Sequence, residues 1–264
     1  MKTLKVIKIG WKIIVNEVSL LSFLKDFSRL NGPKVLVHGG GKLASDLSKK
    51  MNIPVQMIEG RRVTNLETLD IITMVYAGKI NKYIVAKLQS FGCNSVGFSG
   101  ADGNTIIANK RSENPIDYGF VGDVVKVDVN IPKILINNNI VNIFSAISHD
   151  EKGQLLNTNA DTIASELAIA FSNDYEVELY YCFEKKGVLM HTNDENSVIK
   201  KITKRTYTEL KTSNIINEGM IPKLDNCFYA LDRKVSRVFI GHPSMLFDQH
   251  SNFTKIQKSW EKIN

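Results

Sequence analysis

The stretch VLVHGGGKLASDL, residues 35–47, determines the fold class of this chain. A run of apolar residues ends in Gly39, Gly40 and Gly41, and the residues after them have helical spacing. A glycine turn between a strand and a helix leaves backbone N–H groups unpaired at the positive end of the helix dipole, where an anion can bind. The stretch therefore predicts a strand, an anion-binding loop and a helix. The alternative is a tight turn without a ligand.

Strand-like and helix-like segments alternate on both sides of this stretch. Residues 4–10 are typical of a buried strand, and the residues after Asn16 have one apolar helical face that we expect to end at Gly32. Further strands are expected at 94–100, 119–130, 139–147, 175–183 and 235–241, and further helices at 65–92, 202–210 and 219–233. Such alternation predicts an α/β protein, a three-layer α/β/α sandwich with a mainly parallel central sheet.

The pattern of strands and helices begins again near residue 173, and no Pro/Ser-rich linker precedes it. We therefore expect two lobes, 1–172 and 173–264, that share one sheet rather than two independent domains.

The charge of the chain is positive but dispersed. Its net charge is +7, and no block of five or six like charges occurs. This balance suits a small ligand that carries phosphate, and it gives little support to a nucleic-acid partner. No run of about 18 apolar residues is present, and the three cysteines are widely spaced. We expect a cytoplasmic protein with free thiols and without a membrane partner.

The glycine stretch differs from one familiar phosphate-binding loop and matches another in part. A Walker A loop is excluded, because Leu43 stands where Ser or Thr must follow the Gly-Lys pair. A dinucleotide fingerprint fits better, since Gly39, Gly41 and Ala44 match G-x-G-x-x-A and Glu59 follows twenty residues after the first glycine. A dehydrogenase that binds NAD is therefore an alternative. Such a fingerprint normally follows the first strand of its unit, which is not the case here.

Three other segments place polar residues at predicted element ends. Lys8 lies at the end of the first strand, where ligands meet an open α/β sheet. Asn157, Asn159 and Asp161 occupy alternate positions before a helix, and Lys223 begins another helix. Each has a structural alternative: a solvated strand end for Lys8, a helix cap for Asp161 and a surface lysine for Lys223.

Taken together and in this order, these segments resemble the acetylglutamate kinase family within the amino-acid kinase superfamily. The resemblance covers nearly the whole chain and rests on KIG, VHGGG, GRRVT, MVYAGKINK, VGFSGADG, YGFVGD, LNTNAD, KKGVL and GMIPK. It implies the amino-acid kinase fold and ATP-dependent phosphorylation of the side-chain carboxylate of N-acetyl-L-glutamate in arginine biosynthesis. It also implies ATP with Mg²⁺ and a homodimer.

The resemblance assigns a role to each site residue. Lys8 and Lys223 would stabilise the transferred phosphoryl group, with the Asp161 carboxylate between them. The N–H groups of Gly40 and Gly41 would hold the substrate's side-chain carboxylate and the γ-phosphate. Other substrate-binding residues would be Arg62, Asn157 and Asn159, with Arg61 as a further candidate; nucleotide-binding residues would be Gly10, Glu184, Gly187 and Lys223. No protein metal ligand is expected.

Several positions differ from the family pattern. Trp11 replaces the second glycine after Lys8, and Phe183 and Glu184 replace a Thr/Ser-Asp pair. A catalytically impaired relative that binds a metabolite or a nucleotide is therefore a second alternative. Arg61 replaces a leucine, which raises the possibility that the substrate is N-succinyl-L-glutamate, with a second carboxylate.

Overall fold

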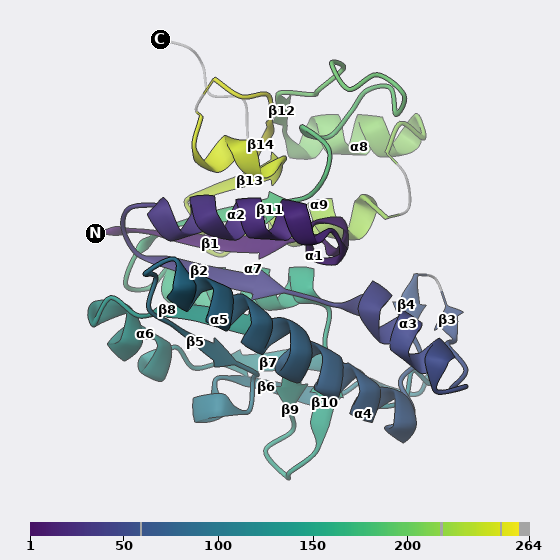
Figure 1. Cartoon of the computed structure of the whole chain (residues 1–264). Helices are drawn as coiled ribbons and strands as arrows, with labels where there is room; N and C mark the ends of the chain where they lie inside the picture. The colour runs from purple at the N-terminus through teal and green to yellow at the C-terminus, as the bar shows by residue number, and fades with distance from the viewer. Residues whose placement is uncertain (59, 217–218, 249, 259–264) are drawn as a thin grey trace.

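The structure, a computed structural model, describes residues 1–58, 60–216, 219–248 and 250–258 and has three layers (Figure 1). The strands of the middle layer are β1 (Thr3–Ile9), β2 (Lys34–His38), β5 (Ser95–Phe98), β8 (Val141–Ser145), β11 (Glu176–Cys182), β12 (Lys201–Ile202), β13 (Arg237–Gly241) and β14 (Thr254–Ile256). They form one sheet in the order β12-β14-β13-β11-β1-β2-β8-β5. Pairing is parallel from β13 to β5, and β14 is antiparallel to β13. The predicted three-layer sandwich with a mainly parallel sheet is confirmed.

Helices cover both faces of this sheet because its strands are apolar on both sides. In β1, Val6 belongs to one buried cluster and Ile7 to the other. One face packs against α6 (Asn130–Asn137), α7 (Ala160–Phe171) and α9 (Ile221–Asp232), with α8 (Lys204–Thr212) beside α9. The other face packs against α1 (Trp11–Val15), α2 (Glu17–Arg29), α3 (Gly41–Lys50), α4 (Leu66–Thr73) and α5 (Asn81–Ser90).

Strand β1 joins the two halves of the chain. It lies between β2 and β11, so that Lys8 is paired with Val37 on one side and with Tyr181 on the other. The central sheet thus contains strands from both halves of the sequence. The division into lobes at residue 172 remains a prediction.

The predicted long helix over residues 65–92 is one rod made of three parts. It begins after Asn65, whose side chain accepts a hydrogen bond from the Thr68 N–H, and it continues as α4, a π-helical segment η1 (Met74–Ile80) and α5. Figure 1 shows α4 and α5 as one rod across this face of the molecule. The π-helical turns were not predicted, and such turns occur often at functional sites.

Two smaller sheets lie beside the central one. A four-stranded sheet has the order β10-β9-β6-β7, and a two-stranded hairpin pairs β3 with β4. The strand predicted over residues 119–130 is found as β7, whereas its partner β6 was not predicted. Glu59, part of the dinucleotide hypothesis, lies outside the described residues. The bounds are β3 (Met57–Ile58), β4 (Arg61–Arg62), β6 (Ile106–Lys110), β7 (Gly122–Val127), β9 (Ile147–His149), β10 (Leu155–Asn157), and the 3₁₀ turns η2 (Asp102–Asn104) and η3 (Pro243–Leu246).

Helix α2 ends earlier than the sequence predicted. Its last residue is Arg29 rather than one next to Gly32. The buried ammonium group of Lys34 donates to the carbonyl oxygens of Phe27, Ser28 and Leu30 at 2.8, 3.1 and 2.7 Å. The end of this helix is therefore satisfied by a side chain from β2 rather than by a glycine cap.

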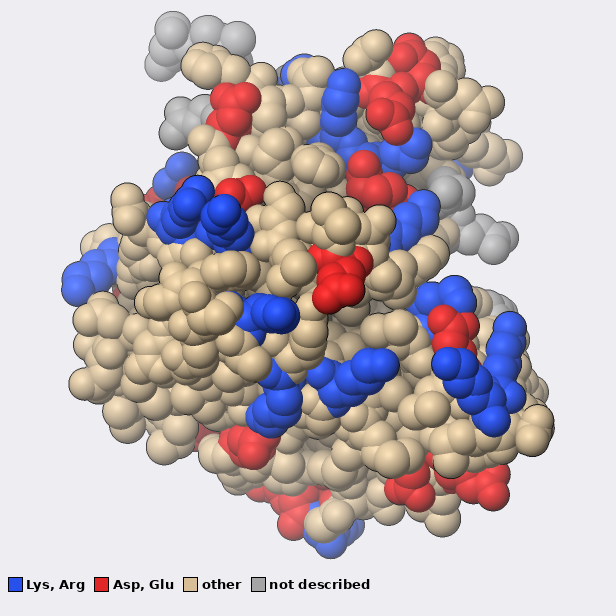
Figure 2. All heavy atoms as spheres, in the orientation of Figure 1, with Lys and Arg blue, Asp and Glu red and all other residues tan. Residues whose placement is uncertain are grey.

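Charged side chains are interspersed on the surface. On the face seen in Figure 2, Lys and Arg form several separate groups with Asp and Glu between them. The net charge of +7 is thus not gathered into one band on this face. Within the described residues, no helix is long and apolar enough to cross a membrane.

Candidate active site

Two lysines from distant parts of the chain meet at one carboxylate. Side chains alternate along β1, so Lys8 faces the same side as Val6, the side covered by α7. Asp161 lies in the first turn of α7 and Lys223 in the first turn of α9. The Lys8 and Lys223 Nζ atoms lie 2.7 Å from Asp161 Oδ1 and Oδ2 respectively. The structure therefore brings together the three residues predicted to be catalytic.

The electrostatics of this cluster follow from its burial. About one-sixth of each side chain is exposed, 14% for each lysine and 17% for Asp161. Burial alone would raise the pKa of Asp161, but the charges and hydrogen bonds of Lys223 and Lys8 outweigh it and hold the pKa below its usual value. Burial lowers the pKa of Lys8, and Asp161 opposes that shift. Asp161 is thus an anion that compensates two neighbouring cations.

The start of α7 holds Asp161 in place. Asn159 is the N-cap, and its side-chain oxygen accepts hydrogen bonds from the N–H groups of Asp161 and Thr162. The Tyr181 hydroxyl donates to the Asp161 carbonyl at 3.0 Å, and Lys223 Nζ lies 5.1 Å from the centre of the Tyr181 ring. The helix-cap interpretation of Asp161 is therefore wrong, because Asn159 caps this helix and leaves the Asp161 carboxylate to the lysines.

The glycine loop lies next to this cluster. A Cβ atom at Gly39 would be 3.5 Å from the Cβ of Ala160, the residue before Asp161. At Gly40 a Cβ atom would be 2.5 Å from Ile80 and 2.6 Å from the Tyr76 ring, so any other residue would force these side chains of the π-helical segment to shift. Within the described part of the chain, no hydrogen-bond acceptor lies on the Gly40 or Gly41 N–H. These N–H groups are free to donate to a bound anion, and that role remains a prediction.

Arg62 reaches the same loop from β4. Its Nη2 donates to the Gly41 carbonyl at 2.9 Å and to Ser45 Oγ at 2.7 Å. Its Nη1 is buried and has no partner within the described residues. Arg61 is exposed, as expected for the neighbour of Arg62 in an extended segment. The Tyr76 hydroxyl lies near this buried guanidinium group, and the unpaired Nη1 beside the glycine loop suits a ligand carboxylate.

The two predicted asparagines have different partners. The Asn157 side chain donates to Thr64 Oγ1 at 3.0 Å, next to the Arg62 segment. Asn159 is engaged in capping α7. The Thr64 contact brings Asn157 and Arg62 to one side of the glycine loop, while the substrate-binding role of either asparagine remains a prediction.

Of the predicted nucleotide-binding residues, Lys223 lies in α9, and the other three follow the carboxyl ends of β1 and β11. The Gly10 N–H donates to the Cys182 carbonyl at 2.8 Å, and a Cβ atom at Gly187 would lie 2.7 Å from Thr254 Oγ1. The Glu184 carboxylate is paired with Lys12 at 2.5 Å. Lys12 could not be predicted as the partner of Glu184, because the two residues are 172 positions apart in the sequence.

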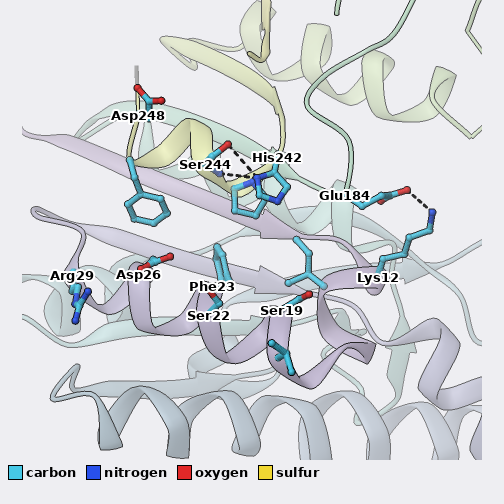
Figure 3. A pocket seen from close by; sticks show the side chains of 14 residues that line it. Lys12, Ser19, Ser22, Phe23, Asp26, Arg29, Glu184, His242, Ser244 and Asp248 are labelled. Atoms are coloured by element: carbon cyan, nitrogen blue, oxygen red, sulfur yellow. Dashed lines mark hydrogen bonds and ion pairs between the residues drawn. The ribbon is translucent and has the colours of Figure 1, made fainter. Parts of the chain in front are cut away.

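A pocket of about 720 Å³ opens beside this ion pair (Figure 3). Figure 3 shows Lys12 and Glu184 at one side of it, and Ser19 and Phe23 of α2 facing His242 and Ser244. Its described lining does not include the cluster at Asp161.

Trp11 is the first residue of α1 and has a helical backbone. It is not among the described residues with positive φ, so it carries no left-handed strain, and 49% of its surface is exposed. Whether the indole crowds the phosphates remains a prediction.

Known proteins share the sequence and the fold of this chain. The model of the amino acid kinase family matches residues 3–242, and the chain belongs to that family. Acetylglutamate kinase of Cytophaga hutchinsonii is 53% identical over 249 residues, with 94% of each chain covered. Acetylglutamate kinase of Bacteroides thetaiotaomicron is 47% identical, with 97% of this chain and 98% of the relative covered. The resemblance to acetylglutamate kinases is confirmed.

The fold is shared more widely than the sequence. Carbamate kinase from Giardia lamblia has a TM-score of 0.72 at 13% identity, with 98% of this chain and 99% of that chain covered. The similarity at this identity concerns the fold alone, and it agrees with the predicted amino-acid kinase fold.

Proposed function

We propose that this protein transfers the γ-phosphoryl group of ATP to the side-chain carboxylate of N-acetyl-L-glutamate, in arginine biosynthesis. The observation that carries the proposal is the Asp161 carboxylate, held between Lys8 and Lys223 beside the glycine loop. The acetylglutamate kinases that are 53% and 47% identical to the chain support the substrate. They give no support to N-succinyl-L-glutamate or to an NAD-dependent oxidoreductase.

The reaction needs charge stabilisation more than proton transfer. A side-chain carboxylate is already ionised at pH 7, so one of its oxygens attacks the γ-phosphorus directly while the bond to the β–γ bridging oxygen breaks and ADP leaves. Negative charge spreads over the transferred group, and Lys8 and Lys223 stabilise it from two sides. Asp161 keeps the two ammonium groups together before the phosphates arrive.

The substrate would be held at the glycine loop. The Gly40 and Gly41 N–H groups would bind the reacting carboxylate and the γ-phosphate, and Arg62 Nη1 would bind the α-carboxylate with Asn157 nearby. Gly10, Glu184 and Gly187 would lie on the nucleotide side. Mg²⁺ would come with ATP and reduce the negative charge of its phosphates. Both Asp161 oxygens are paired with lysines, so Asp161 is not proposed as a metal ligand.

The central test is an assay of ADP release with five acceptors. We expect turnover with N-acetyl-L-glutamate and at least tenfold lower kcat/KM with N-succinyl-L-glutamate, glutamate, aspartate and UMP. No turnover with any acceptor would favour the catalytically impaired relative. In that case, recovery of activity in Trp11→Gly would identify the indole as the cause.

Lys223→Ala tests the assignment of the transferring group. We expect kcat to fall on the order of 10²-fold or more, with a smaller change in substrate affinity, because the lost interaction develops in the transition state. Lys211→Ala, which removes an exposed lysine of α8, serves as the control. An unchanged kcat in Lys223→Ala would contradict the assignment.

The adjacent arginines provide a matched pair for the substrate carboxylate. Arg62→Leu should raise KM for N-acetyl-L-glutamate at least tenfold, whereas Arg61→Leu should change it less than twofold. Equal effects of the two substitutions would argue against specific binding by Arg62.

We also propose that the enzyme is a cytoplasmic homodimer. Light scattering coupled to size-exclusion chromatography should give about twice the mass of 29.6 kDa. A monomer mass at micromolar concentration would contradict the dimer.

A further inference from the structure

A buried histidine lies directly before the glycine loop and has no role in the reaction described above. His38 is the last residue of β2, and its side chain is fully buried. Its Nδ1 lies 2.9 Å from the Gly39 carbonyl oxygen, and its Nε2 lies 3.1 Å from Asn81 Nδ2. Asn81 is also buried and follows the π-helical segment at the start of α5. The histidine thus joins the loop to the long helix.

The partners of the imidazole define its tautomer. A carbonyl oxygen can only accept, so Nδ1 must carry the proton and donate to Gly39. The Asn81 amide nitrogen also contacts the Ile143 carbonyl at 2.9 Å, which identifies it as a donor, so Nε2 accepts. Burial lowers the pKa of His38 to about 4, despite the hydrogen bond to Gly39, and the ring is therefore neutral at pH 7.

This arrangement determines which way one peptide group faces. In a trans peptide, the carbonyl of one residue and the N–H of the next point in opposite directions. Since the Gly39 carbonyl is held toward His38, the Gly40 N–H is directed away from it. That N–H has no acceptor within the described residues. Without His38, a glycine peptide has little to prevent it from rotating.

We propose that His38 and Asn81 are a positioning pair that fixes the Gly39–Gly40 peptide so that the Gly40 N–H points at the anion bound by the loop. The inference rests on the proposed function of the loop and adds two residues to it. Asn81 holds the imidazole in the tautomer that donates to Gly39. The π-helical segment then has a specific purpose: it packs Tyr76 and Ile80 against Gly40 and places Asn81 beside His38.

Two substitutions of His38 separate positioning from packing. An asparagine side chain places an NH₂ group close to the position of imidazole Nδ1, whereas a glutamine side chain reaches the position of Nε2 instead. His38→Asn therefore retains a donor for Gly39, and His38→Gln retains only a partner for Asn81. Asparagine is the smaller residue and leaves the larger void, so a purely structural role predicts that His38→Asn is the worse variant.

The experiment measures kcat, KM and the melting temperature of both variants beside the wild type. We expect kcat of His38→Gln to fall on the order of 10²-fold, the loss typical of one misplaced N–H donor. The kcat of His38→Asn should fall less than tenfold, although its melting temperature is no higher than that of His38→Gln. Greater activity in His38→Gln than in His38→Asn, or equal losses that follow the melting temperature, would overturn the proposal.

Two NMR measurements test the pair independently of turnover and of variant folding. Ring ¹⁵N shifts of wild-type His38 should show a protonated Nδ1 and an unprotonated Nε2; the opposite tautomer would overturn the proposal. The Gly40 amide signal of ¹⁵N-glycine protein should shift on addition of MgATP or N-acetyl-L-glutamate. An unperturbed Gly40 signal would also overturn it. If the wild-type protein gave both NMR results but showed no turnover, the proposed function would be contradicted and the positioning role of His38 and Asn81 would stand.

Discussion

At the scale of single residues, Asp161 has the strongest electrostatic role in the site. Two ammonium groups within 2.7 Å of one carboxylate would repel each other if that carboxylate were neutral. A group whose pKa is lower in the folded state stabilises the fold above its unfolded pKa of about 3.9, and this contribution is lost as the pH falls toward the folded pKa. Asp161 therefore links catalysis to acid stability.

Asp161→Asn should alter both properties. We expect kcat to fall at least 10²-fold, and the free energy of unfolding at pH 7 to fall because two buried cations lose their counter-ion. Between pH 5 and pH 3 the variant should lose less stability than the wild type, since it lacks the carboxyl group that must be protonated. Urea unfolding at several pH values measures this. Asp70→Asn, an exposed change on α4, should follow the wild-type profile, and a similar slope in Asp161→Asn would contradict the linkage.

Single residues also show what the sequence could and could not predict. Lys8, Asp161 and Lys223 were recognisable because each lies in a short motif at a predicted element end. The carboxylate between two lysines was expected from the resemblance to the family, and charge repulsion gives the physical reason for it. The Lys12–Glu184 pair and the His38–Asn81 contact join residues that are distant in the sequence. His38 and Asn81 lie in the VHGGG and MVYAGKINK motifs, but neither motif indicates that the two side chains meet. Such contacts depend on the packing of elements, which periodicity does not specify.

At the scale of elements, the long helix acts as a support for the glycine loop. Its π-helical segment places Tyr76 and Ile80 so close to Gly40 that a methyl group would overlap both side chains. The apolar spacing of the sequence predicted the length of the helix, with Gly78 inside it. It did not predict the π-helical turns, since they change the direction of side chains without breaking the apolar pattern.

Two glycine substitutions test this support. Gly40→Ala should displace the π-helical segment and lower both the melting temperature and kcat. Gly78→Ala lies within that segment, where an added Cβ has nothing within 4 Å, and it should be neutral or stabilise by up to about 1 kcal/mol. Thermal unfolding and the ADP-release assay measure both effects. A Gly40→Ala protein with wild-type stability would show that the helix can yield and that the close contact is not required.

Lys34 is a second residue that stabilises an element, the C-terminal end of α2. Its substitution by methionine keeps the aliphatic length but leaves the Ser28 and Leu30 carbonyl oxygens without their donor, while the Phe27 carbonyl still accepts from the Leu30 N–H at 3.2 Å. Leaving buried acceptors unpaired should cost roughly 1 to 3 kcal/mol of unfolding free energy. Lys25→Met, an exposed change on the same helix, should cost less than about 0.5 kcal/mol. Activity per folded molecule should remain unchanged in both, and equal stability would contradict the capping role.

At the scale of the whole molecule, the central sheet makes the two halves of the chain interdependent. The alternation of strands and helices was enough to predict a parallel sheet, and the restart near residue 173 suggested two lobes. The order of strands was not predictable, because a local pattern does not say which strands become neighbours. The four-stranded sheet was not predicted for the same reason, since β6 is a strand through its pairing with β7 and β9.

Cutting the chain at the predicted lobe boundary tests this interdependence. Residues 173–264 alone would expose the edge of β11 that pairs with β1 over seven positions. We expect neither 1–172 nor 173–264 to unfold cooperatively when expressed alone, and co-expression to restore a complex that releases ADP. Circular dichroism during urea unfolding measures the first point. Cooperative unfolding of 173–264 by itself would show that the second lobe is an independent domain.

The position of β1 has a consequence for how the protein is made. The strand that carries Lys8 leaves the ribosome well before its neighbour β11, which begins only at Glu176. At synthesis rates of about 5–20 residues per second, β1 is made roughly 10 to 35 s before that neighbour. During this time one edge of an apolar strand is open to other chains. The same long-range pairing should slow refolding in vitro. We therefore expect a chaperone to reduce aggregation most when it binds the nascent N-terminal half, before β11 has been made.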